Sequence, residues 1–250
     1  KPKFRLTTDL SWPHVGTMWA GGAAVDSVNG GMDRSAWPAN RLVRVRECAE
    51  AAGIMQGSAQ QRRTRLWSLD CEAFYRAVGR QRAELWRNGV WGLRGATLDG
   101  RCCFGDASAA AKCSRISNYL VFQMRAALAA FDADHPTRDA EWMGWAERRR
   151  AAGVGAQLYW LSMYVDDGIG SSADDLVFDM SGQAVLGADG VQRRRADCHF
   201  EAARAAVERY GWVSAPGKEQ RPARSVVALG VHVDLPTSSM RLSADKCERY

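Results

Sequence analysis

The first third of the chain alternates between short regular segments and long polar ones. Residues 3–10 alternate loosely between apolar and polar positions and predict a strand. Residues 11–40 are rich in Gly, Pro, Asp and Ser, which predicts a long loop. The pattern over 41–52 is helical, and Gly53 is the expected end of that helix.

The middle of the chain predicts a strand, a small sheet and a long helix. Residues 66–70 form a short apolar run typical of a strand, and 83–105, with several Gly and Trp residues, predict a small sheet with turns. Apolar residues then recur at helical spacing at Ile116, Leu120, Met124, Leu128 and Phe131. Asp106 or Ser108 is the expected cap of that helix. The regularity ends in polar residues 132–150, which are expected to form an irregular insertion.

The next segment predicts a hairpin that carries two acids at its tip. Residues 156–165 are strongly apolar, and Asp166 and Asp167 follow them directly. A glycine comes next and an apolar residue after it, as in a hairpin whose turn holds the acid pair. Residues 179–195 are polar again and are expected to form a loop.

The last part predicts a helix and a strand. Residues 196–210 place apolar side chains on one helical face, and Gly211 is the expected stop. Alternating apolar positions over 227–233 predict a strand that Pro236 ends. The order strand, helix, hairpin, helix, strand predicts an α+β fold, an antiparallel sheet with helices packed on one face.

Composition narrows the class of protein. With 250 residues, 46% of them apolar and 25% charged, the chain has the size of one large globular domain or two lobes. The net charge of +6 favours an acidic partner, of which nucleic acid is the commonest. We expect no membrane association, because no apolar run is long enough for a span and no signal peptide is visible. Because an initiator Met is missing, we expect a fragment of a longer protein.

The cysteines and histidines argue against other kinds of site. Seven cysteines without a C-x-x-C pair favour a reducing compartment over a disulfide framework or a zinc site. The four histidines show no ligand spacing.

The strongest chemical signal is a set of three acids. Asp166 and Asp167 taken alone also fit an ordinary turn. A third acid, Asp70, ends the strand predicted over 66–70. Two Mg²⁺ ions that act on a phosphoryl group need two or three carboxylates around them, and an acid on one strand with an acid pair on a neighbouring hairpin supplies these.

Motifs around these acids resemble those of reverse transcriptases and occur in the order of that family. The first runs Asp70-Cys71-Glu72-Ala73-Phe74-Tyr75, an acid followed five residues later by an aromatic. The others are Phe104-Gly105, Tyr164-Val165-Asp166-Asp167, Gly217-Lys218, Leu229-Gly230-Val231 and, at the front, the fingers motif that begins at Lys3. The variants are most similar to those of retrotransposons of the DIRS type.

The resemblance implies a role for each acid. Asp70 and Asp166 would bind both Mg²⁺ ions, for which Mn²⁺ can substitute, and Asp167 would contribute charge and geometry. The backbone carbonyl of Cys71 would add a metal ligand. Lys218 would protonate the leaving pyrophosphate.

It also implies how the substrates would bind. Tyr75 would exclude the ribose 2′-hydroxyl, and the primer strand would contact Leu229 and Gly230. The nucleotide-binding residues would be Lys3, Arg5, Phe74, Tyr75, Phe104 and Gly105. The partners would be an RNA or DNA template, a primer and dNTPs, in the cytoplasm or nucleus.

The resemblance further implies a right-hand polymerase whose palm is ferredoxin- or RRM-like. The fingers would be 1–65 and 79–103, the palm 66–78 and 104–235, and the start of a truncated thumb 236–250. The residues after Phe104-Gly105 depart from the family, since Ala-Ala-Ala-Lys-Cys stands at 109–113 where Ala-Pro and then Phe are usual. This departure puts the shape of the nucleotide site in doubt.

Two other functions stay open on this sequence. An RNA-directed RNA polymerase uses the same metal chemistry but usually has a polar residue at the position of Tyr75. An inactive or domesticated remnant would bind nucleic acid through its basic surface, without any need for the acids.

Overall fold

The structure is a computed structural model, and it divides the chain into two compact units. One unit contains Ala73–Ile116, and the other consists of Leu42–Glu72 and Ser117–Tyr250. The strand and loop predicted over 3–40 lie outside the described residues. These are 44–56, 63–79, 82, 89–92, 95–98, 100–102, 107–215 and 217–247.

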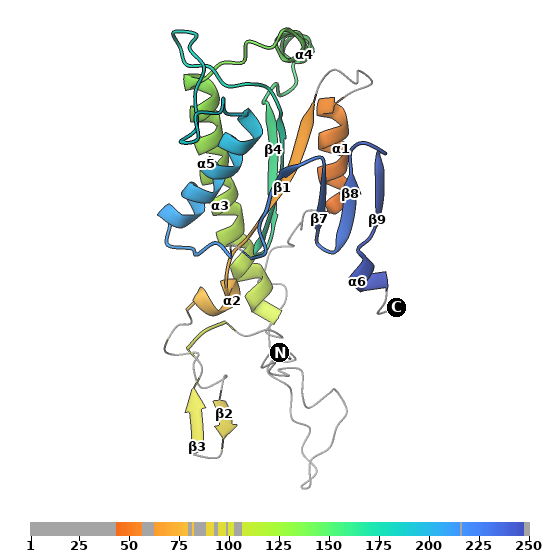
Figure 1. The fold of residues 1–250 in the computed structure, drawn as a ribbon. Helices are drawn as coiled ribbons and strands as arrows, with labels where there is room; N and C mark the ends of the chain where they lie inside the picture. The colour runs from red at the N-terminus through yellow and green to blue at the C-terminus, as the bar shows by residue number, and fades with distance from the viewer. Residues whose placement is uncertain are drawn as a thin grey trace. The chain divides into compact units, whose positions relative to one another are not determined.

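A four-stranded antiparallel sheet forms the centre of the larger unit (Figure 1). Its strands lie in the order β4 (Tyr159–Tyr164), β5 (Asp167–Ala173), β1 (Thr64–Asp70) and β6 (Gln220–Ala223). The strand predicted over 66–70 and the hairpin predicted around the acid pair are therefore confirmed. The antiparallel α+β class is confirmed with them.

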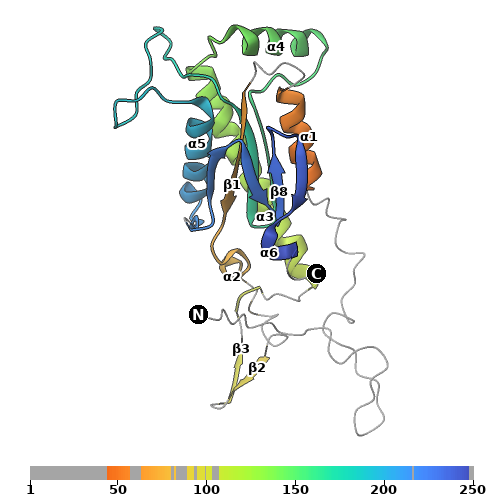
Figure 2. The same ribbon diagram turned by 45° about the vertical axis from the view of Figure 1, so that its right-hand side comes forward.

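Helices cover both faces of this sheet, so the prediction of helices on one face is wrong (Figures 1 and 2). One face carries α5 (Arg195–Arg209) and the C-terminal part of α3 (Ala107–Asp134). The opposite face carries α1 (Val45–Gln56). A sheet covered on both sides has apolar residues at successive positions, and β1 has them: Leu66 and Trp67 are both fully buried.

The two neighbours on β1 show which helix covers which face. Leu66 packs in a cluster with Cys48 and Ala52 of α1. The ring of Trp67 points the other way and meets Phe200 of α5 edge to face, with 6.0 Å between the ring centroids. Because successive side chains of β1 point to opposite faces, this strand contributes to a hydrophobic core on each side of the sheet.

A second antiparallel sheet packs against the α1 side of the larger unit. It consists of β7 (Ser225–Ala228), β8 (Val231–Asp234) and β9 (Ser239–Leu242). The single strand predicted over 227–233 is thus wrong, because the chain reverses at Leu229 and Gly230. Both residues have positive φ, 51° and 77°, as a two-residue type I′ turn requires. Across this turn the buried positions change from Val226 and Ala228 to Val233, and the apolar but exposed Val227 hides the change in the sequence.

The smaller unit holds α2 (Phe74–Ala77) and the hairpin of β2 (Gly89–Gly92) and β3 (Gly95–Leu98). This hairpin confirms the small sheet predicted over 83–105. Ser108 lies inside α3, not at its start, so it is not the cap of that helix. Asp106, the other expected cap, lies outside the described residues.

The structure differs from two of the helix predictions. The polar stretch 132–150 contains α4 (Ala140–Ala151), capped by Asp139, whose side chain accepts hydrogen bonds from Glu141 N and Trp142 N. Its buried stripe is short, chiefly Trp142 and Trp145, and therefore gives little periodic signal. Helix α1 continues past Gly53 to Gln56, because Met55 extends its buried face.

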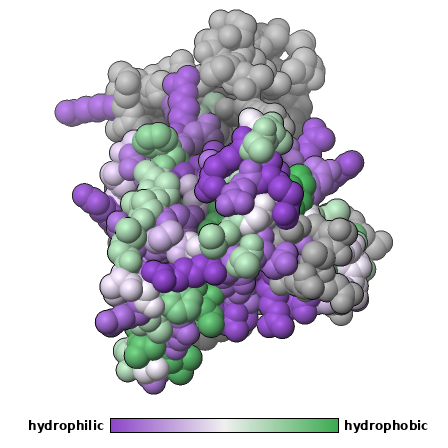
Figure 3. All heavy atoms as spheres, turned by 90° about the horizontal axis from the view of Figure 1, so that it is seen from above, coloured by the Kyte–Doolittle hydropathy of each residue, from purple (hydrophilic) through white to green (hydrophobic). Residues whose placement is uncertain are grey.

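The segment 174–194 is better ordered than the loop expected there. Isolated bridges pair Leu176 with Arg194, Phe178 with Ala184 and Leu186 with Gln192. The segment lies at the end of the sheet far from the acid pair, and Figure 3 shows apolar and polar side chains interspersed at this end.

A buried ion cluster anchors this segment to α3 and α5. The fully buried Arg195 donates to both oxygens of Asp175, at 2.7 and 3.0 Å, and to Asp132 at 2.5 Å. His199 contacts the same Asp132 oxygen at 2.9 Å. Because an unpaired buried charge is strongly destabilising, this cluster holds the segment firmly.

In the part of the chain that the structure describes, no helix combines the length and the apolar character needed to span a membrane.

Gly170→Ala should destabilise the protein, because Gly170 faces its β1 partner Trp67 across the sheet. A Cβ at Gly170 would lie 2.2 Å from the indole ring, which is itself held by a hydrogen bond from its Nε1 to Ser172 Oγ. We expect a loss of about 1–3 kcal/mol in the free energy of unfolding, measured by chemical denaturation.

Gly53→Ala is the matched control. Gly53 lies within α1 with no heavy atom within 4 Å of an added Cβ. This variant should gain about 0.5–1 kcal/mol from helix propensity. Equal effects of the two substitutions would contradict the packing described for Trp67.

Candidate active site

Three carboxylates meet at one end of the central sheet. Asp70 is the last residue of β1, and Asp167, the first residue of β5, is its direct partner in the antiparallel register. Asp166 lies in the turn just before Asp167, and its backbone carbonyl accepts a hydrogen bond from Cys71 N at 3.1 Å. The pairing of β1 with β5 thus gathers residues about a hundred positions apart in the sequence.

The turn that presents Asp166 has an unusual backbone. Val165 has a φ of 56°, the left-handed region that a β-branched residue rarely adopts. It is the first of the two residues between Tyr164 and Asp167, the position at which type II′ hairpins prefer glycine. The buried Val165 side chain and a hydrogen bond from Ser117 Oγ to the Val165 carbonyl, at 2.5 Å, hold this conformation. Such strain, on the order of 1–3 kcal/mol, is typical of functional turns.

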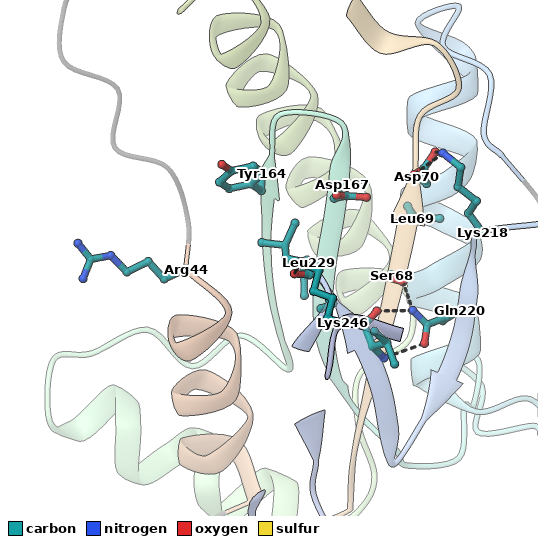
Figure 4. A pocket seen from close by; sticks show the side chains of 14 residues that line it. Arg44, Ser68, Leu69, Asp70, Tyr164, Asp167, Lys218, Gln220, Leu229 and Lys246 are labelled. Carbon is teal, nitrogen blue, oxygen red and sulfur yellow. Dashed lines mark hydrogen bonds and ion pairs between the residues drawn. The ribbon is translucent and has the colours of Figure 1, made fainter. Parts of the chain in front are cut away.

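A single lysine faces the acids. Lys218, in the turn before β6, donates through Nζ to both carboxylate oxygens of Asp70, at 2.7 and 2.9 Å (Figure 4). The hydrogen bond with Asp70 raises the pKa of Lys218, and the charges of Asp70, Asp166 and Asp167 raise it further. Lys218 therefore stays a cation and offsets part of the negative charge.

The three acids can carry more negative charge than Lys218 neutralises. Burial raises the pKa of Asp167 to about 7, and the charges of Asp166 and Asp70 add to this shift, while Lys218 opposes it. A carboxyl group with such a pKa is half protonated near neutral pH. The site therefore holds an excess of negative charge that a cation could relieve.

Cys71 is the residue that follows Asp70. Its thiol is buried, and burial together with the neighbouring acids raises its pKa to about 12. The role predicted for the Cys71 carbonyl stays a prediction.

An open groove of about 740 Å³ runs from the acids to the β7–β8 turn (Figure 4). Asp70, Asp167 and Lys218 line one part of it, and Leu229 and Gly230 line another. The structure therefore brings two of the three expected metal-binding acids, Asp70 and Asp167, and the expected primer-contact residues into one groove of the larger unit.

Two further cations line this groove that the sequence pattern did not single out. Arg44 precedes α1, and Lys246 belongs to α6 (Ala244–Cys247). Lys246 Nζ donates to the Leu229 carbonyl at 3.1 Å. Neither residue belongs to a recognisable motif. The positive net charge of the chain indicated basic residues in general, but not these two.

Two of the six predicted nucleotide-binding residues belong to the smaller unit. Phe74 is buried and Tyr75 half-buried, both on α2 in the smaller unit. Lys3, Arg5, Phe104 and Gly105 lie outside the described residues. The nucleotide-binding roles of all six residues stay predictions.

The donor chemistry of the site suits Mg²⁺, although the side chains are not gathered as a finished metal cage. Carboxylate oxygens are the ligands that Mg²⁺ prefers, and the raised pKa of Asp167 marks excess negative charge. Across the described ranges, however, no three His, Cys, Asp or Glu side chains converge as a metal site requires. Asp70 is turned to Lys218 instead.

Asp167→Asn should stabilise the protein in a pH-dependent way. The folded pKa of Asp167 lies above the unfolded value, so the free energy of unfolding falls as pH rises from about 4 to about 7. Asparagine removes this effect. Because the carboxyl group is partly exposed to screening solvent, we expect a gain of roughly 1–2 kcal/mol near pH 8 and a smaller gain near pH 5.

The measurement is urea denaturation of both proteins at the two pH values. Asp134→Asn, at an exposed position of α3, is the control and should show no such trend. A gain that is equal at both pH values would show that neither burial nor the neighbouring acids raise the pKa of Asp167 in the folded protein.

No protein-family model and no curated protein matches the chain. Among solved structures, it is similar to the foamy viral protease-reverse transcriptase in complex with an RNA/DNA hybrid, with a TM-score of 0.45 and 12% identity over 80% of this chain and 20% of that one. It is also similar to that enzyme in complex with double-stranded DNA, with a TM-score of 0.45 and 11% identity over 85% of this chain and 31% of the other. The chain thus spans about a fifth to a third of these proteins, and the likeness is one of fold.

Proposed function

We propose that the chain is the polymerase core of a reverse transcriptase, which transfers a nucleotide from a dNTP to a primer 3′-hydroxyl. The observation that carries the proposal is the register of β1 and β5, which sets Asp70 beside Asp167 with Asp166 in the adjoining turn. The same three acids belong to motifs that follow the order of this enzyme family in the sequence.

Asp70, Asp166 and Asp167 would hold two Mg²⁺ ions. When bound, these ions would lower the pKa of the attacking hydroxyl and stabilise charge on the phosphoryl group. The hairpin turn at Val165 holds Asp166 and Asp167 at the open end of the sheet, where a phosphate can reach them. The excess negative charge makes the site a poor place for a nucleic-acid phosphate in the absence of cations.

Lys218 would have two roles in this account. It neutralises Asp70 in the protein without substrates. Since it stays protonated and is about half exposed, it is available as a cation or proton donor to a phosphate that enters the groove.

The expected substrates are an RNA or DNA template, a primer and dNTPs. Arg44, Lys218 and Lys246 give the groove positive charge suited to a nucleic-acid backbone. A retroelement origin is proposed from the sequence motifs, and the DIRS type rests on those variants alone.

Asp166→Asn and Asp167→Asn should each abolish primer extension. With poly(rA)/oligo(dT), Mg²⁺ and dTTP, we expect each rate to fall by at least about a hundredfold, since each substitution removes a charge that faces the reacting phosphate. Asp134→Asn is the control and should extend primers like the wild type.

Two outcomes would contradict this function. One is extension that survives in both mutants. The other is a wild type that does not extend primers but binds the duplex with a steep salt dependence that the substitutions leave unchanged. The second outcome would favour the binding remnant.

Tyr75→Ala should raise the incorporation of ribonucleotides relative to deoxyribonucleotides if Tyr75 excludes the 2′-hydroxyl. We expect roughly a tenfold change in the ratio of the two kcat/KM values, with Tyr75→Phe as the control that keeps the ring. An unchanged ratio would remove the steric role of Tyr75 and strengthen the RNA polymerase alternative.

A further inference from the structure

One side chain links the acid-bearing sheet to the β7–β8 hairpin. Gln220, the first residue of β6, accepts a hydrogen bond from Val227 N at 2.8 Å through Oε1. Its Nε2 donates to the Val227 carbonyl at 2.5 Å and to Ser68 Oγ at 3.1 Å (Figure 4). The amide thus forms hydrogen bonds with the backbone of β7 as a neighbouring strand would, and it also donates a hydrogen bond to a side chain of β1.

The two residues that Gln220 contacts, Ser68 and Val227, lie close in sequence to the acid and to the turn. Ser68 lies two residues before Asp70, and Val227 lies two residues before Leu229. Gln220 therefore spans from the strand that carries the acid to the strand that carries the turn. All of these residues line the same groove.

Lys246 fixes the turn from its other side. Its Nζ donates to the Leu229 carbonyl, and its aliphatic stem packs so closely on Gly230 that an added Cβ would lie 2.1 Å from Lys246 Cε. The turn is thus held at its base by Gln220 and at its tip by Lys246.

The hairpin does not depend on Gln220 for its folding. Val226, Ala228 and Val233 are buried against Leu66 and Ile169 of the central sheet. Leu229 of the turn packs against the same cluster, so apolar contact keeps the hairpin in place. Apolar contact is non-directional, whereas the hydrogen bonds of the Gln220 amide and of Lys246 constrain the orientation of the turn.

We propose that Gln220 is a positioning residue that sets the Leu229–Gly230 turn relative to Asp70 and so places the primer strand in the groove. The inference rests on the proposed polymerase function. It requires an amide, because the side chain donates and accepts at the same backbone residue. Gln220→Glu keeps the acceptor but sets a carboxylate against the Val227 carbonyl, and Gln220→Met keeps the length but loses all three hydrogen bonds.

The test compares these variants with Gln192→Met in steady-state primer extension. Gln192 also donates its amide to a backbone carbonyl, that of Val177 at 3.1 Å, but in the segment at the far end of the sheet. For both Gln220 variants we expect the KM for poly(rA)/oligo(dT) to rise about tenfold, as the loss of two or three hydrogen bonds would cause. The KM for dTTP should change less than about twofold.

A merely structural role would give a different result. It would lower kcat and the melting temperature together and leave both KM values unchanged. That pattern, or a KM for primer–template equal to that of Gln192→Met, would overturn the proposal.

A wild type that extends no primer would overturn the proposed function, and the positioning role is then decided by binding alone. Fluorescence anisotropy gives the Kd for a labelled RNA/DNA hybrid, and hydrogen exchange reports the Val227 amide. Weaker binding with faster exchange in Gln220→Met supports the positioning role, and an unchanged Kd overturns it.

Discussion

The antiparallel pairing of β1 with β5 brings the acids of the candidate site together. This register sets two carboxylates side by side, an arrangement that their mutual repulsion opposes. Burial first and this repulsion second raise the pKa of Asp167, and Lys218 forms an ion pair with Asp70. Lys218 offsets only part of this negative charge, and the proposed role of the site in binding cations and phosphate follows from the remainder.

The rest of the larger unit supplies the rigidity that such a site needs. Both faces of β1 and β5 are buried, with Leu66 against α1 and Trp67 against α5. The close fit of Trp67 on Gly170 locks the register of the pair, because a slip by one residue would turn every side chain to the wrong face. The buried packing also supports the left-handed backbone of Val165 in the turn that leads to Asp167, an acid that lines the groove.

The parts of the structure that local pattern decides could be predicted from the sequence. Strand β1, the β4–β5 hairpin with its acids, and α5 have strong periodic signals and clear turn residues. The apolar pattern did not reveal the turn at Leu229–Gly230, because the exposed Val227 is as apolar as the buried Val226 and Ala228. It did not reveal α4, because two tryptophans carry most of the buried face of that helix. Placement of α1 on the opposite face depends on tertiary packing, which alternation along β1 alone does not reveal.

The site itself was only partly predictable. Asp70, Asp166 and Asp167 stood out because acids after apolar strands are unusual, whereas Gln220, Arg44 and Lys246 belong to no pattern. Their importance comes from long-range contacts, such as the hydrogen bond between Gln220 and Ser68, which are 152 positions apart.

The most direct test of the central claim is Mn²⁺ binding, followed by electron paramagnetic resonance in the presence of primer–template. If the three acids form a cation site in competition with Lys218, Asp70→Asn should weaken binding at least about tenfold and Lys218→Met should strengthen it. Mn²⁺ affinity that neither substitution changes would contradict the account.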